Sequence, residues 1–182
     1  MTRLALCCLL LSAAVARSAA EPAVYGTEPG PYAVQSASCR LTRAQPNASD
    51  LSVRVTWPRL ENLEKEDQGP RFPVIVFSHG MYGSKQAYDP LIRHWASHGY
   101  VCVQTDHPDS LAHGLQSREE AQRAWRERPR QVSFLIESLA KLEAGVPGLE
   151  GRVDRERIGV GGHSFGAHTS LLIGGATMRG AG

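Results

Sequence analysis

Two short apolar runs in the chain, residues 73–77 and 100–105, predict strands that are buried on both faces. Strands of a parallel sheet that is covered by helices have this pattern. Residues 157–161 predict a third short strand. An earlier stretch, 51–57, alternates apolar and polar residues and stops at Pro58, which is typical of a strand with one buried face. Residues 32–41 are its candidate hairpin partner.

Helical periodicity fills the segments between these runs. Residues 86–98 have apolar residues at core spacing, and 117–128 form a very polar helix that Pro129 is expected to interrupt. Residues 131–142 follow with an apolar face at the helical period of about 3.6 residues. A small-residue helix comes after the last strand. This alternation predicts an α/β fold with a mostly parallel sheet, helices on both faces and right-handed crossovers.

The first twenty residues have the pattern of a secretory signal peptide. A basic start precedes an apolar run over 4–15, and small residues lead up to Ala20. The run is shorter than the roughly 20 residues that span a bilayer, so we expect no stable membrane span. We expect cleavage after Ala20, a domain over 21–182, and a secreted or periplasmic protein. An uncleaved membrane anchor is the alternative.

The overall composition fits an ordinary globular domain, with 182 residues of which 42% are hydrophobic and 21% charged. A net charge of +2, with acidic and basic residues interspersed, gives no reason to expect a nucleic-acid partner. No metal-ligand spacing and no phosphate-binding glycine loop is found, so no metal or cofactor is expected. Cys102 lies in an apolar run and is interpreted as a buried free thiol, while Cys39 could pair with a cysteine beyond the visible end.

Residues 162–166, Gly-His-Ser-Phe-Gly, match the G-x-S-x-G pattern of a nucleophile elbow. They fall directly between an apolar strand and a helix, which is the context that this motif requires. Such a turn strains the serine backbone, and Gly162 and Gly166 keep the strand and the helix from colliding. His163 is expected to pack under the elbow. Ser164 is therefore the candidate nucleophile, and an inert serine in a glycine-rich turn is the alternative.

An acyl-transfer enzyme also needs two N–H donors that converge on the oxyanion of its tetrahedral intermediate. Phe165, directly after the nucleophile, is expected to supply one of them at the start of the helix. The other is expected from the loop after the first buried strand, where His79 and Gly80 let the backbone bend close to a substrate. In that loop the Met81 N–H is the first candidate, and Tyr82 is the second.

Three stretches, 77–80, 106–108 and 154–166, together resemble one branch of the α/β-hydrolases. This branch holds plasma-type platelet-activating-factor acetylhydrolases, chlorophyllase-like and dienelactone-hydrolase-like proteins, and polyester-cleaving cutinases. The resemblance implies the α/β-hydrolase fold, a serine nucleophile and an oxyanion hole formed by Met81 and Phe165. A dienelactone hydrolase proper would have a cysteine nucleophile, so the serine argues against that chemistry.

The acid and base that would activate Ser164 are not found in the visible chain. In this fold both follow the serine, yet 165–182 contain no Asp or Glu and a single histidine, His168, which is expected to point away from the substrate. Asp106 and His107 are neighbours on an extended segment and point in opposite directions, so pocket-lining or loop-capping roles are expected. We therefore expect the N-terminal portion of a hydrolase domain, without its later strands.

The sequence thus predicts a serine-dependent carboxylic-ester hydrolase of the esterase or lipase type that works through an acyl-enzyme. Small-molecule or lipid esters, including phospholipid acyl esters, are the expected substrates. A catalytically inactive hydrolase shell that serves as a binding domain is the alternative, because the acid and base are absent. The charged segment 118–130 is interpreted as a solvated helix face. Its rival interpretation is a rim that orients an anionic substrate or lipid head group, with Trp125 as an interfacial contact.

Overall fold

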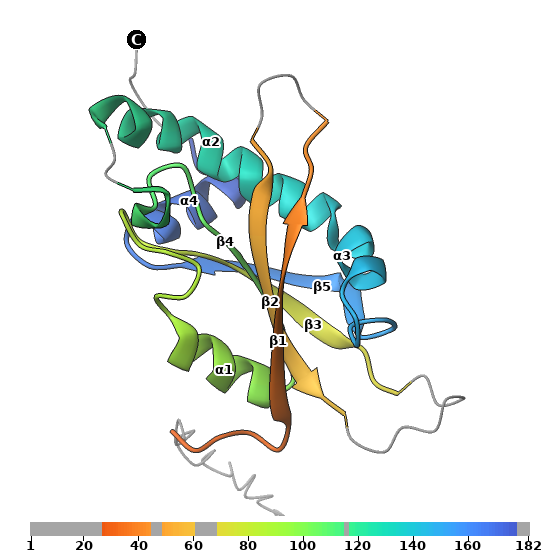
Figure 1. Cartoon of the computed structure of the whole chain (residues 1–182). Helices are drawn as coiled ribbons and strands as arrows, with labels where there is room; N and C mark the ends of the chain where they lie inside the picture. Colours follow the sequence, from red (N-terminus) through yellow and green to blue (C-terminus); the bar gives the residue numbers. More distant parts are fainter. Residues whose placement is uncertain (1–26, 45–48, 61–68, 115–116, 178–182) are drawn as a thin grey trace, which may run out of the picture.

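A five-stranded mixed sheet organises the computed structural model, which describes residues 27–44, 49–60, 69–114 and 117–177 (Figure 1). The strands are β1 (Ala33–Leu41), β2 (Leu51–Arg59), β3 (Phe72–Ser78), β4 (Val101–Thr105) and β5 (Val153–Gly162). They lie in the order β1-β2-β4-β3-β5. The strands β3, β4 and β5 are parallel, while β2 is antiparallel to both β1 and β4. The α/β fold predicted from the sequence is confirmed; the expected signal peptide lies outside the described residues.

Helices cover both faces of this sheet. They are α1 (Asp89–Ser97), α2 (Arg118–Glu137), α3 (Leu139–Gly145) and α4 (Phe165–Ile173), with a short 3-10 helix, η1 (Leu111–His113). Figure 1 shows α1 and the α2–α3 pair on opposite sides of the strands. Among the described residues, none of these helices has both the length and the apolar character needed to cross a membrane.

The residues of β3 show why its sequence is continuously apolar. Val74 and Val76 belong to the larger core, which also contains the apolar faces of α2 and α3. Phe77 belongs to a second cluster with Ile92 of α1, and Ile75 packs against it. Successive side chains of a strand point to opposite faces, so a strand covered on both sides needs apolar residues at every position.

The expected helix break at Pro129 is wrong, because α2 continues through this residue. An internal proline removes one hydrogen bond and crowds the preceding turn, at a cost of about 3 kcal/mol. On either side of it α2 buries side chains on one face, Ala124 and Arg128 before the proline and Val132 and Leu135 after it. Packing of both halves against the same layer outweighs the local cost, and the chain instead changes from α2 to α3 at Ser138.

The predicted hairpin of the first two strands is confirmed, and its turn lies outside the described residues. One boundary differs from the expectation, because β2 runs through Pro58 to Arg59. Pro58 lies opposite Val34 of β1, whereas the pairing of β2 with β4 ends at Thr56. Beyond that residue β2 pairs with β1 alone, and strand positions of this kind tolerate a residue without an N–H.

Candidate active site

Ser164 lies on a sharp turn between the end of β5 and the start of α4. Its φ is 51° and its ψ is −115°. A positive φ is uncommon for a residue with a side chain, and within the described chain only Tyr82 shares this property. The serine is exposed. The strained, exposed turn between a parallel strand and a helix is the geometry that presents a nucleophile.

Gly162 and Gly166 lie where three backbone segments touch. A Cβ on Gly166 would stand 1.9 Å from the carbonyl oxygen of Ser78 and 2.8 Å from that of His79. A Cβ on Gly162 would stand 2.4 Å from the carbonyl carbon of Gly166. All three distances are shorter than the 3.0 Å that real Cβ contacts essentially never go below, so only glycine lets β5 and α4 meet the end of β3 here.

The segment 79–83, which we call the oxyanion loop, follows β3 and lies directly against the elbow. A Cβ on Gly80 would stand 3.0 Å from Nδ1 of His163, the residue before the nucleophile. The N–H of Tyr82 donates to Oδ2 of Asp109 at 3.3 Å, so this second candidate donor is engaged. The structure gives no acceptor for the Met81 N–H among the described residues. The geometry therefore favours Met81 as the donor from this loop.

Phe165 is the first residue of α4. An N–H group in the first turn of a helix has no acceptor inside that helix. It therefore remains available to an oxyanion beside Ser164, and the positive end of the helix dipole lies at the same place. The ring of Phe165 is buried at 6% exposure, which holds the residue against the protein interior.

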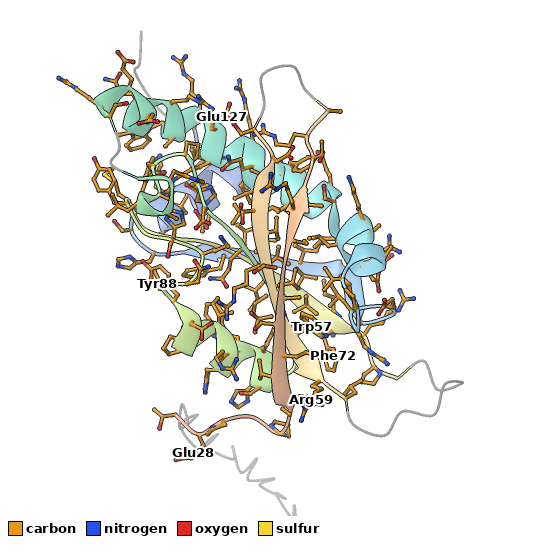
Figure 2. All side chains as sticks on the ribbon, viewed as in Figure 1. Glu28, Trp57, Arg59, Phe72, Tyr88 and Glu127 are labelled. Atoms are coloured by element: carbon orange, nitrogen blue, oxygen red, sulfur yellow. The ribbon has the colours of Figure 1, made fainter. Side chains whose placement is uncertain are left out.

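A hydrogen-bonded bridge joins the oxyanion loop to the elbow on the exposed side. The N–H of Gly80 donates to Oη of Tyr88 at 3.3 Å, and this oxygen lies 2.8 Å from Nδ1 of His163. Tyr88 stands immediately before α1 (Figure 2). His163 was expected to pack under the elbow, but it is exposed because its ring reaches sideways to Tyr88.

Arg128 of α2 lies beneath the oxyanion loop and is fully buried, at 0% exposure. Its Nε and Nη2 donate to the two carboxylate oxygens of Asp109, at 2.8 and 2.7 Å. It also donates to the carbonyl oxygens of His79, at 2.6 Å, and Gly80, at 3.1 Å. The interpretation of segment 118–130 as a solvated face is wrong for Arg128, because α2 continues past Pro129 and turns this residue inward.

Two histidines lie next to this cation. In the ring of His107, Nε2 lies 2.8 Å from Oγ of Ser78 and Nδ1 lies 2.7 Å from Oε1 of Gln131. The backbone N–H of His107 donates to Nε2 of His79 at 3.1 Å. Burial, together with the charge of Arg128, lowers the pKa of His107 well below its ordinary value. Burial likewise lowers the pKa of His79. Both rings are therefore neutral at neutral pH and serve as fixed hydrogen-bonding groups.

Asp106 and His107 do not form an acid–base pair for Ser164. Asp106 accepts the backbone N–H of Lys85 at 2.8 Å and pairs with the Lys85 side chain, so it fastens the chain ahead of α1. The ring of His168 meets that of Trp125 edge to face, with 4.9 Å between ring centroids. In the described part of the chain, no hydrogen bond joins a histidine to the hydroxyl of Ser164. No group of three or more His, Cys, Asp or Glu is arranged there to hold a metal ion.

Comparison with known proteins gives matches over more than half of the chain. The profile of the family described as "Platelet-activating factor acetylhydrolase, isoform II" matches residues 44–143. Platelet-activating factor acetylhydrolases of Cavia porcellus and Canis lupus familiaris are both 26% identical to the chain, over 138 and 141 residues. Each match covers 57% of this chain and 32% of the relative, so the chain spans about a third of the length of these curated relatives.

A solved structure shares the fold. The ferulic acid esterase from Streptomyces cinnamoneus matches with a TM-score of 0.61 at 21% sequence identity. The match covers 85% of this chain and 57% of that chain. It therefore includes most of the sheet and helices described above.

Proposed function

Because the chain belongs to the platelet-activating factor acetylhydrolase isoform II family, we propose that it is a serine-dependent carboxylic-ester hydrolase with Ser164 as nucleophile. The observation that carries this proposal is the elbow. Ser164 is exposed at positive φ, between two glycines that have no room for a side chain. A strained backbone that is held by tight packing on both sides supports a functional role for the residue.

In this mechanism Oγ of Ser164 attacks the carbonyl carbon of the ester while a general base takes the hydroxyl proton. The carbonyl oxygen becomes an oxyanion and accepts the N–H groups of Met81 and Phe165. Collapse of the tetrahedral intermediate expels the alcohol, which takes a proton, and leaves an acyl-enzyme that water hydrolyses. Each oxyanion donor contributes about 3 kcal/mol to lowering the barrier.

We propose lipid acyl esters as the substrate class. Four large apolar side chains are exposed on the elements around Ser164: Met81, Tyr82, Leu111 and Trp125. Ser110, next to Leu111, donates to the carbonyl of Gly83 at 2.6 Å, and Trp125 lies 4.5 Å from Phe165 between ring centroids. Exposed apolar groups gathered beside a nucleophile suit an acyl chain better than a charged substrate.

Active-site labelling of the protein expressed from the complete open reading frame tests the nucleophile. We expect one equivalent of a fluorophosphonate to react with the wild type and none with Ser164→Ala. Ser170→Ala is the matched control, because the Ser170 hydroxyl donates only to the carbonyl of Gly166 within α4. A folded wild type that takes up no label would contradict the proposal and favour the non-catalytic shell.

The substrate class is tested separately by comparing two esters of one acyl group. One is a phospholipid and the other a water-soluble ester. We expect a higher kcat/KM for the phospholipid, and Leu111→Ser should lower that value while leaving the soluble ester unaffected. Equal values for both esters would contradict the lipid assignment without affecting the nucleophile.

A further inference from the structure

We propose that Arg128 is a positioning residue that aligns both N–H donors of the oxyanion hole. This inference rests on the proposed function, since it concerns the same site. Arg128 does not touch the substrate position. It acts through the backbone of the oxyanion loop on one side and through Phe165 on the other.

The first step concerns the peptide unit between Gly80 and Met81. A trans peptide is planar, so its C=O and its N–H point in opposite directions. Nη2 of Arg128 donates to the carbonyl oxygen of Gly80 at 3.1 Å, and this oxygen, which also accepts the N–H of Gly83 at 3.0 Å and lies 2.7 Å from Nδ1 of His79, is held on the inner side of the loop. The Met81 N–H of the same plane must then point away from the interior, toward the side where Ser164 is exposed. A second bond, from Nη1 to the carbonyl of His79 at 2.6 Å, fixes the preceding peptide.

The peptide unit after Met81 is held by the partner of Arg128. Oδ2 of Asp109 accepts the N–H of Tyr82 at 3.3 Å and also accepts Nη2 of Arg128 at 2.7 Å. The planes on both sides of Met81 are therefore tied to one buried ion pair. Burial opposes ionisation of Asp109, but the hydrogen bonds and charge of Arg128 outweigh it and hold its pKa below the ordinary value.

The second donor is reached through an aromatic contact. The guanidinium carbon of Arg128 lies 4.3 Å from the centroid of the Phe165 ring. Contact of a cation with a ring face at this distance is attractive, and it is stronger where water is excluded. Arg128 thus contacts the peptide that carries the Met81 N–H, through the carbonyl of Gly80, and it also contacts the ring of Phe165. The two donors are joined in this way although they are far apart in the sequence.

The chemistry of arginine explains why this residue type is used. Nε, Nη1 and Nη2 donate in fixed directions to four residues, Asp109, Ser78, His79 and Gly80, and the guanidinium lies over an aromatic ring. A lysine ammonium can pair with Asp109 but cannot hold all these groups at once. Buried ion pairs contribute little to stability compared with apolar packing. The arrangement is therefore better explained by the orientation it imposes on the loop.

The test compares Arg128→Lys with Arg43→Lys in the protein expressed from the complete open reading frame. Arg43 is also buried, pairs with Glu127 of α2 at 3.3 Å and lies over Phe134 at 5.9 Å. The two substitutions thus make the same chemical change in similar surroundings, and only one affects the oxyanion loop. Active sites are titrated with a fluorophosphonate, and kcat and KM are measured per titrated site with a soluble ester. The Ki of a trifluoromethyl ketone, which forms a tetrahedral oxyanion adduct, is measured in parallel.

For Arg128→Lys we expect kcat per titrated site to fall by about 10- to 100-fold, with KM nearly unchanged. The Ki of the ketone should rise by the same factor, because it reports binding of the oxyanion. Arg43→Lys should leave both values unchanged. If Arg128→Lys only lowers the number of titratable sites or the unfolding temperature, Arg128 supports the fold alone and the proposal is overturned.

A second variant covers the case in which Arg128→Lys does not fold. Asp109→Asn keeps the size of the side chain but removes the charge that orients the guanidinium. We expect it to lower kcat and raise the ketone Ki in parallel, by about 10-fold. Unchanged values for Asp109→Asn would overturn the proposal, while label uptake by the wild type would show that the nucleophile assignment still holds. A wild type that takes up no label would contradict both the assignment of Ser164 as nucleophile and the positioning role of Arg128.

Discussion

Replacing Gly166 with alanine probes the backbone contact on which the elbow depends. Within an ordinary helix this change stabilises a protein by roughly 0.5–1 kcal/mol. At Gly166, however, the added Cβ would lie 1.9 Å from the carbonyl oxygen of Ser78 and 2.6 Å from its carbonyl carbon. Since real Cβ contacts are essentially never shorter than 3.0 Å, the first turn of α4 and the end of β3 must separate by at least about 1 Å.

Neither atom that meets the new Cβ belongs to a flexible side chain, so the strain must be taken up by the backbone. Overpacking of this kind costs about 1–3 kcal/mol, which exceeds the gain in helix propensity. The same movement displaces the N–H of Phe165 and the hydroxyl of Ser164. A displacement of about 1 Å at a reacting group lowers the rate by about 100-fold. We therefore expect a loss of both stability and kcat.

Urea unfolding and kcat per titrated site measure the two effects. Gly161→Ala is the matched control, because Gly161 lies in β5 just before the elbow and its Cβ would meet nothing closer than Cδ2 of Phe77, at 3.8 Å. We expect the control to change the free energy of unfolding by less than about 1 kcal/mol and to retain kcat. An equal or higher unfolding free energy for Gly166→Ala, with unchanged kcat, would refute the reasoning.

Three further predictions concern two sets of groups around the site and one thiol in the core. Since the lowered pKa values of His79 and His107 let the unfolded chain take up protons that the folded chain refuses, the unfolding free energy should fall as pH drops below 6.5. Denaturant titrations should show a slope of up to about 1.4 kcal/mol per pH unit for each histidine, and His107→Gln should reduce it. Tyr88→Phe removes the bridge to His163 and should lower kcat several-fold with little change in unfolding temperature; an unchanged kcat would contradict this. Burial raises the pKa of Cys102 to about 12, so iodoacetamide at pH 8 should modify this thiol only after unfolding, as peptide mass analysis would reveal.

The fold and the family could be predicted from the sequence because their signals are local. The apolar runs that became β3 and β4 reflect burial on both faces, which is a property of each strand by itself, whereas β5 lies at the edge of the described sheet and is mostly exposed. The motifs after β3 and β5 indicated the branch of α/β-hydrolases, and the match to the acetylhydrolase family confirms it. Ser164 was singled out for the same reason, since an elbow is encoded by five consecutive residues.

Arg128 was missed because a local rule was applied where tertiary packing decides. Pro129 suggested that the helix ends, and so the apolar face of 131–142 was not extended backward. Continued at the same period from Val132, that face passes through Arg128 and Ala124, and all three are buried. A charged residue in phase with an apolar face was therefore a usable signal for an inward-facing cation. Its pairing with Asp109 is not encoded by any periodic pattern.

The choice between Met81 and Tyr82 illustrates a similar limit. Both follow Gly80 in a loop without periodicity, and adjacent N–H groups are chemically equivalent in the sequence. The distinction comes from Asp109, a residue after β4 whose carboxylate occupies the N–H of Tyr82. Such a contact joins two loops across the carboxyl edge of the sheet, and it becomes visible only when the strands are placed side by side.

The position of Arg128 on the helix between β4 and β5 has a consequence for the order of folding. The oxyanion loop is synthesised early, yet its shape depends on a side chain that docks only when α2 has packed, and Phe165 comes later still. A chain in which β1 to β4 have paired therefore has no formed oxyanion hole. With Ser164 acting as proposed, hydrolytic activity during refolding should appear together with the closure of the β3–β5 pair, after the bulk of the secondary structure has formed. The site thus reports on the completion of long-range contacts, and a folding intermediate would be catalytically silent.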